Sequence, residues 1–427
     1  MTDNRHKFGD LIMTQGTASY FQSDSDFEKR FSLLKDKIRE LFNLKNINFL
    51  FGSGTSSGAI PTMDGLFSEL KFDDEKEVAE KAEFERIVNK VGENLEATLE
   101  VMYSARIYYD GIQTDDENIK EFKELYNRLI NRIEGYIFNS INVDMAKEKS
   151  KEVLRYYKTF YQKIALRNKD LSRIRIFTTN NDLFNETALD SLNIHYINGF
   201  GGGLRKYFNP ALFNYTWSKR MDTSIDKYEP VENMVYLYKI HGSINWQETE
   251  HKMNNYFNIE ELSPQQLSSE KSVLIYPTPT KQDKSLGVPY VDLFREFQNK
   301  LLEPHSVLFI IGYGFNDRHV NDIIYRALAT NSTINVVIFG KKPADDEKAK
   351  KPIFFINDNR IFTISGKAWN EEQDESGRIT KTNERTINYF DYIVDELLPN
   401  LDSFRKEENM LEAFVKQLNE TKSEKLF

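Results

Sequence analysis

From residue 47 to residue 61 the chain reads Ile47-Asn-Phe-Leu-Phe51-Gly52-Ser53-Gly54-Thr55-Ser56-Ser-Gly-Ala-Ile-Pro61. The short apolar run up to Phe51 predicts a buried strand. The glycines after it predict a turn whose backbone N–H groups can approach a pyrophosphate, with the dipole of the next helix adding to the attraction. Hydroxyl groups in the turn can also bind phosphate or ribose. A tight surface turn is the alternative, because the GxGxxxG spacing differs from the dinucleotide-binding GxGxxG.

Further short apolar runs predict the other strands of the same sheet. They lie at Ile174–Thr178, Ile194–Ile197, Val235–Ile240, Ser272–Tyr276, Val307–Ile311, Ile334–Phe339 and Arg360–Ile364. Helical spacing is found at 290–302 and 317–329, between the later strands. Apolar strands that alternate with helices are typical of a parallel sheet covered on both faces. We therefore predict an α/β fold, with a Rossmann-like and mostly parallel sheet.

The remaining segments are added to this core. Dense Glu and Lys between helically spaced apolar residues predict a helical insertion after the first strand. The predicted parts are a core at 27–66 and 170–369, a helical insertion at 67–169, an N-terminal arm at 1–26 and a C-terminal helical segment at 370–427. Within the last, polar residues 370–385 predict a loop, and 387–398 and 407–418 predict helices.

Composition limits the possible functions. The 427 residues carry 57 Lys and Arg against 66 Asp and Glu, a net charge of −9, and no cysteine. The absence of cysteine excludes disulfides, thiolate metal sites and a cysteine nucleophile. No signal peptide and no apolar run near the ~18 residues of a membrane span are present, so we expect a cytoplasmic protein without membrane association. The negative charge argues against a wholly nucleic-acid-binding surface, but direct nucleic-acid binding through a local groove stays open.

Polar residues follow two other predicted strands. One group is Thr178-Thr-Asn180-Asn-Asp182, and the other is His241-Gly242 after an apolar strand. Polar residues at the carboxyl end of a strand face the crevice in which open α/β sheets bind ligands. Histidine is the side chain best matched to base catalysis near neutral pH. The alternatives are structural: Asp182 can cap the helix that follows it, and a lone histidine is more often structural.

A second glycine turn follows the strand at 307–311. It reads Gly312-Tyr313-Gly314-Phe315-Asn316-Asp317-Arg318-His319 and predicts a second backbone cradle. Asn316 or Asp317 as a helix cap is the structural alternative. We expect Arg318 and His319 on the solvated first turn of that helix rather than in catalysis.

In this order, the four groups resemble the sirtuin (silent information regulator two) family, and more closely its bacterial sirtuin-like NAD hydrolase branch. The family's Gly-Ala-Gly-x-Ser…Gly-Ile-Pro loop is similar to residues 52–61, which are one residue shorter before Ile-Pro. Its Thr-Gln-Asn-x-Asp is similar to 178–182, its His-Gly to 241–242, and Gly312-Tyr313-Gly314 stands in place of its late Gly-Thr-Ser. The resemblance covers about 47–66 and 174–339.

The resemblance implies roles for these residues, with NAD as the substrate. Asn180 would position the attacking water and contact the ribose, Asp182 would hold the nicotinamide carboxamide, and His241 would act as a base. The loop of Gly52, Ser53, Gly54, Thr55 and Ser56 would take the pyrophosphate, and Gly312, Tyr313, Gly314 and Phe315 would line the adenosine half. Pro61 and Thr178 would also contact the cofactor. Loss of nicotinamide passes through an oxocarbenium-like transition state and needs no strong acid, since nicotinamide leaves neutral.

The departures from the family point away from protein deacylation. Family deacylases hold a structural zinc with four cysteines, and this chain has none, so we expect no zinc. Water is then the natural acceptor, which favours NAD hydrolysis. The resemblance further implies NAD depletion in anti-phage defence (abortive infection), a homo-oligomer, and a HerA-type hexameric ATPase as partner.

Two other functions stay open. The chain could bind NAD or ADP-ribose as a sensor without turnover, although Asn180 together with His241 argues against this. It could be a nucleic-acid-acting subunit of an ATPase complex, although no carboxylate cluster with metal-binding spacing supports a nuclease. We expect no metal at the site.

Overall fold

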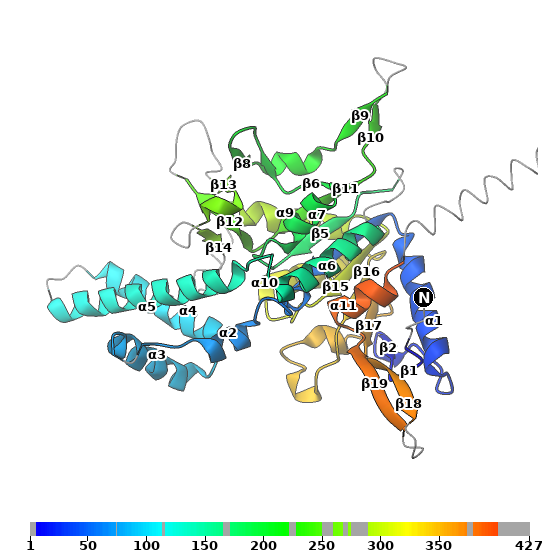
Figure 1. Ribbon diagram of the computed structural model, residues 1–427, viewed down its shortest axis with the longest axis horizontal. Coiled ribbons are helices and arrows are strands. Elements are labelled where there is room, and N and C mark those ends of the chain that lie inside the picture. Colours follow the sequence, from blue (N-terminus) through cyan, green and yellow to red (C-terminus); the bar gives the residue numbers. More distant parts are fainter. Residues whose placement is uncertain are drawn as a thin grey trace, which may run out of the picture.

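The computed structural model describes residues 6–73, 75–112, 116–164, 171–221, 228–249, 259–267, 272–274, 289–373 and 379–399. A large sheet forms its centre (Figure 1). In spatial order its strands are β3 (Ala18–Ser19), β2 (Ile12–Gln15), β17 (Ile361–Ser365), β16 (Asn335–Phe339), β15 (Ser306–Ile311), β4 (Asn46–Phe51), β5 (Arg175–Thr178), β11 (Met234–Lys239) and β6 (His195–Ile197). The run from β17 to β6 is parallel throughout, and β2 and β3 add an antiparallel edge. The predicted α/β fold with a mostly parallel sheet is confirmed.

The central strand β4 shows why these residues form a doubly covered sheet. All six of its residues are buried, and Leu50 pairs with Ile310 on one side and Phe177 on the other. Successive side chains point to opposite faces, as the period of two requires. Phe49 and Phe51 therefore enter one core and Leu50 enters the other.

Helices cover both of these faces. The core that contains Phe49 is closed by α1 (Phe27–Phe42), α6 (Glu148–Ile164), α7 (Phe184–Ser191) and α11 (Phe390–Tyr392). The core that contains Leu50 is closed by α9 (Tyr290–Leu302) and α10 (Arg318–Thr330). None of the helices in the described part of the chain is long and apolar enough to cross a membrane.

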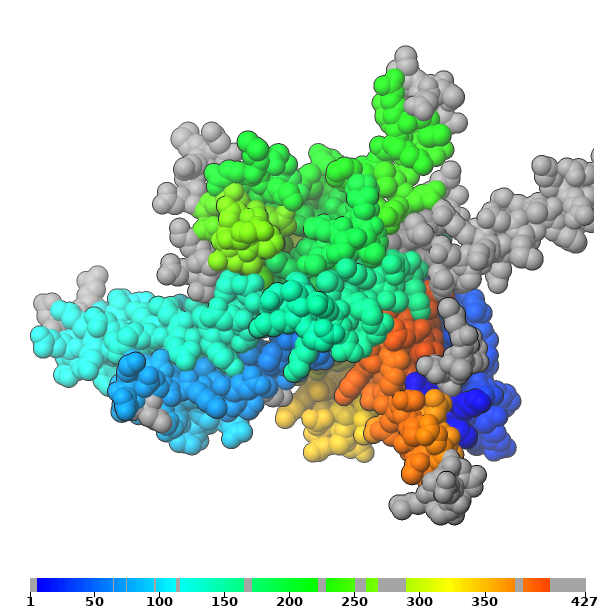
Figure 2. Space-filling view, viewed as in Figure 1, coloured from blue at the N-terminus to red at the C-terminus, as the bar shows by residue number. Residues whose placement is uncertain are grey.

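Four helices between β4 and α6 form a separate lobe. They are α2 (Met63–Glu69), α3 (Val78–Val91), α4 (Leu95–Gly111) and α5 (Glu117–Ile141), and they share an apolar core to which Leu183 and Ile244 also contribute. The lobe projects from the sheet in Figure 1 and from the rest of the molecule in Figure 2. Helix α6 differs, because its buried residues pack on the main sheet, with the Phe160 and Phe49 rings 5.0 Å apart. The division into domains stays a prediction.

A second, antiparallel sheet lies beyond β11. Its order is β14 (Ser272–Leu274), β12 (Gly242–Glu248), β13 (Ile259–Glu261), β8 (Lys206–Phe208) and β7 (Phe200–Gly201). The expectation that 272–276 adds a strand to the parallel sheet is wrong: β14 pairs with β12. A short apolar run predicts a strand but carries no information about its partner.

The loop expected at 370–385 is wrong for the residues that the structure describes, because 370–373 belong to β18 (Lys367–Gln373) and 379–385 to β19 (Ile379–Thr386). These two strands pair antiparallel, and β1 (Phe8–Gly9) pairs with the other edge of β18. Cross-strand contacts replace an apolar core, since Lys367 pairs with Glu384 at 2.6 Å and Lys381 lies 3.5 Å from the Trp369 ring centre. The helix expected at 387–398 is reduced to α11 and a π-helical turn at Ile393–Leu397. The helix expected at 407–418 lies outside the described residues.

Candidate functional site

The four polar turns meet at one edge of the main sheet. They follow β15, β4, β5 and β11, which are consecutive neighbours and parallel, so their carboxyl ends lie side by side. The chain passes from β4 to β5 on one side and later returns to β15 on the other. Open α/β sheets bind ligands at such a switch point.

The two glycine turns pack directly against each other. The Gly54 N–H donates to Gly312 O at 2.9 Å, and a Cβ on Gly54 would lie 2.6 Å from Gly312 Cα. Gly312 also has φ +66°, a left-handed conformation that favours glycine. The N–H groups of Gly52, Gly54, Thr55 and Ser56 all donate to carbonyl groups of the protein. The glycines thus serve the contact between the turns, and these four N–H groups are already occupied.

This contact predicts the effect of a side chain at Gly54. We expect Gly54→Ala to lower the free energy of unfolding by about 1–3 kcal/mol, because backbone must move to admit the Cβ. Urea unfolding followed by circular dichroism measures the change. Gly135→Ala is the control: nothing lies within 4 Å of a Cβ there, and alanine favours the helix. Equal stabilities of the two variants would contradict the close packing.

A buried hydrogen-bond network joins the first glycine turn to the turn after β5. Asn180 Nδ2 donates to Thr55 Oγ1 at 3.0 Å and to Ser56 Oγ at 3.3 Å. Ser56 Oγ also lies 2.8 Å from Asp182 Oδ2. The Tyr157 hydroxyl, from α6, lies 2.7 Å from Thr55 Oγ1 and 3.0 Å from Ser56 Oγ. The structure therefore brings Asn180 and Asp182 together with Thr55 and Ser56, whose hydroxyls point inward.

His241 directly follows β11, at the same edge of the sheet. Its Nε2 is 3.0 Å from Asp317 Oδ2, without the alignment of a hydrogen bond. Asp317 Oδ1 caps α10 by accepting from the His319 and Val320 N–H groups, so the cap expected at Asn316 or Asp317 is Asp317. Because β11 and β15 are separated by β4 and β5, the His241–Asp317 contact spans the ends of both strands.

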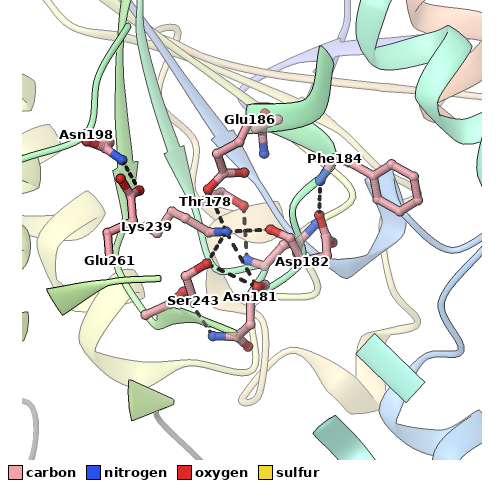
Figure 3. Close-up of polar contacts among 12 residues, drawn as sticks. Thr178, Asn181, Asp182, Phe184, Glu186, Asn198, Lys239, Ser243 and Glu261 are labelled. Carbon is pink, nitrogen blue, oxygen red and sulfur yellow. Dashed lines mark hydrogen bonds and ion pairs between the residues drawn. The ribbon is translucent and has the colours of Figure 1, made fainter. Parts of the chain in front are cut away.

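Lys239 anchors the turns after β5 and β11 to each other (Figure 3). The side chain is 1% exposed, and Nζ donates to Asp182 O, to Ser243 Oγ at 2.6 Å and to Glu186 Oε1 at 2.9 Å. Asn181 adds a clamp, because Nδ2 donates to the His241 carbonyl at 2.8 Å. These bonds fix the backbone on both sides of the site.

Two carboxyl groups share this buried environment. Burial raises the pKa of Asp182 above its usual value, and the positive charge of Lys239 partly opposes the rise. Burial raises the pKa of Glu186 in the same way, again against Lys239. Both directions follow from the cost of a charge in a medium of low polarity.

The other residues predicted for the site take part in different contacts or lie at the surface. Thr178 is buried, and its Oγ1 accepts from the Asn180 N–H at 3.0 Å. Phe315 lies in the apolar core, and the Tyr313 hydroxyl donates to Asp317 O and Asn321 Oδ1. Ser53 and Gly314 are exposed and Pro61 is half-buried. The N-cap position of α7 is Leu183 and not Asp182, although Asp182 Oδ1 accepts from the Phe184 N–H at 3.1 Å.

Sequence reasoning missed Tyr157, Asn181 and Lys239 as parts of the site. Lys239 carried a signal, because a charged residue that ends an otherwise apolar strand must find a buried partner. Tyr157 carried none: it reaches Thr55 across 102 positions of the chain. Among the described residues, no group of three or more His, Asp or Glu side chains is arranged to hold a metal ion.

Part of the chain is similar to a known protein family. Residues 174–364 match the family described as the SIR2-like domain. No curated protein matches the sequence. Among solved structures, one from work on the mechanism and regulation of Sir2 enzymes aligns with 77% of this chain and 93% of its own, at 11% identity and a TM-score of 0.34. The segment that carries Asn180, His241 and Gly312 is thus similar in sequence to the SIR2-like domain family.

Proposed function

We propose that the protein is an NAD glycohydrolase that cleaves the bond between nicotinamide and ribose. The observation that carries the proposal is that Asn180, Asp182 and His241 follow two neighbouring parallel strands, β5 and β11, at the switch point of the sheet. These residues lie within the segment similar to the SIR2-like domain. Fold alone does not imply function, so the proposal rests on the site.

Each residue has a task that its surroundings suit. His241 is the base toward water or a ribose hydroxyl, with Asp317 beside Nε2 to stabilise the imidazolium that forms. Asn180 positions the water against the anomeric carbon, and Asp182 holds the carboxamide. Residues 52–56 and 312–315 are proposed to line the pyrophosphate and adenosine parts of the NAD site, with the first turn contacting pyrophosphate through groups other than its four occupied N–H groups. Water is the acceptor, since a chain without cysteine cannot build the four-thiolate zinc module of the deacylases.

The proposed biological role is NAD depletion in anti-phage defence. Such an enzyme must be silent until triggered, so we propose regulation by a homo-oligomer and by a HerA-type hexameric ATPase. The projecting lobe of α2–α5 offers a surface for these contacts.

Nicotinamide release from NAD tests the activity, with and without the ATPase. We expect release by the parental protein and a loss of about 100-fold or more in Asn180→Ala, because water is no longer oriented. Asn331→Ala is a matched control: both asparagines are 7% exposed and donate two or more hydrogen bonds through Nδ2, but Asn331 binds Leu301 O and Glu303 O away from the site. Equal activity in both variants would remove Asn180 from the mechanism.

A sensor that binds NAD without turnover is the second candidate. The observation in its favour is that the Asn180 amide and the Asp182 carboxyl are buried and hydrogen-bonded to the first glycine turn. NAD binding by calorimetry with no nicotinamide release under either condition would support the sensor.

A further inference from the structure

Tyr157 is fully buried on α6, outside the segment similar to the SIR2-like domain. Its ring stacks on Phe184 at 5.6 Å and packs edge-on against Phe390 at 5.0 Å. The packing holds the hydroxyl between Thr55 and Ser56. Helix α6 therefore supplies a polar group to the centre of the proposed site.

The hydroxyls of Ser56, Tyr157 and Thr55 have one proton fewer than the hydrogen bonds that they would form. Four contacts run in a line: Asp182 Oδ2 to Ser56 at 2.8 Å, Ser56 to Tyr157 at 3.0 Å, Tyr157 to Thr55 at 2.7 Å, and Thr55 to Gly52 O at 2.9 Å. Each hydrogen bond needs one proton, and three hydroxyls supply three. If Asp182 is ionised, Ser56 donates to it and Thr55 donates to Gly52 O, so Tyr157 has one proton for two contacts.

A protonated Asp182 completes the line. Its carboxyl then donates to Ser56, Ser56 to Tyr157, Tyr157 to Thr55, and Thr55 to Gly52 O. The two Asn180 N–H groups that reach Thr55 and Ser56 fill the second lone pair of each hydroxyl oxygen. Every contact then has a donor and an acceptor.

We propose that Tyr157 is a positioning residue of the site, whose hydroxyl links Ser56 to Thr55 in a continuous hydrogen-bond chain that begins at a protonated Asp182. This chain of hydrogen bonds holds the first glycine turn and Asn180 in one arrangement. The proposal rests on the proposed function only in the experiment that measures catalysis.

The groups around Asp182 are compatible with this proton. Lys239 on β11, the Phe184 N–H and the Ser56 hydroxyl favour the ionised carboxyl, while the charge of Glu186 on α7 disfavours it. Burial, the largest influence, raises the pKa of Asp182. When Asp182 is protonated, the Ser56 hydroxyl donates to the Tyr157 oxygen. Removing the Tyr157 hydroxyl takes this acceptor away and so disfavours the protonated form of Asp182. The pKa of Asp182 should therefore fall in Tyr157→Phe.

Tyr161 offers a matched control one turn further along α6. It is also fully buried, and its hydroxyl donates to Asn185 Oδ1 at 2.7 Å instead of to the site. We expect Tyr157→Phe to lower kcat for nicotinamide release about tenfold, with KM changed less than about twofold, and Tyr161→Phe to change neither. Equal effects on kcat in the two variants would overturn the positioning role.

Infrared spectroscopy tests the proton without any turnover, so its failure is separate from that of the proposed function. We expect the carbonyl stretch of a protonated carboxyl near neutral pH in the parental protein, retained in Glu186→Gln and lost in Asp182→Asn. In Tyr157→Phe the band should disappear at a lower pH than in Tyr161→Phe. Absence of the band, its loss in Glu186→Gln, or the same titration in both tyrosine variants would overturn the proposal.

Discussion

Replacing His241 by alanine is expected to lower the rate of nicotinamide release by about 10²–10⁴-fold, the usual contribution of a general base. The imidazole is 13% exposed at the end of β11, next to Asp317. Without it, the imidazole that is proposed to take the proton from water or a ribose hydroxyl is lost. The measurement is the initial rate of NAD consumption at saturating NAD.

The fold should tolerate this change. Asp317 keeps its role as the cap of α10 through Oδ1, and Asn181 still clamps the carbonyl of residue 241. His195→Ala is the control, because His195 is exposed on the edge strand β6 and stacks on Trp217. Parental rates in His241→Ala, with NAD turnover intact in the control, would show that the base lies elsewhere.

Replacing Lys239 by methionine is expected to lower the free energy of unfolding by about 3–5 kcal/mol, the cost of breaking a buried ion pair from one side. The change leaves the Glu186 carboxylate and the Asp182 carbonyl without the ammonium that they contact. Urea unfolding at neutral pH measures the loss. A change below about 1 kcal/mol would mean that water or another group replaces the ammonium.

Two further measurements separate charge from anchoring. Lys239→Met combined with Glu186→Gln removes the unpaired charge and should recover much of the lost free energy of unfolding. The double variant still lacks the Lys239 bonds that link the turns after β5 and β11. Lower pH should also restore part of the stability of Lys239→Met. The sign follows from the raised pKa of Glu186: a carboxyl whose folded-state pKa exceeds its unfolded value favours folding as pH falls through that range.

The strands of the parallel sheet could be predicted because their signal is local. β4, β5, β11, β15 and β16 are short apolar runs, and burial on both faces makes such runs necessary. The motifs that end them could be located for the same reason. The antiparallel pair of β18 and β19 could not, because paired polar strands that bury little apolar surface have the composition of a loop.

The sequence by itself determined the α/β class, the order of the strands along the chain, and which polar residues stand at their carboxyl ends. Only the tertiary structure decided that Gly54 faces Gly312, that Lys239 ties two turns together, and that Tyr157 enters the site from α6. Each of these contacts joins residues far apart in the chain, and local pattern carries no information about such partners. The absence of cysteine could be read at once, but the buried polar network beside β4 became visible only after folding.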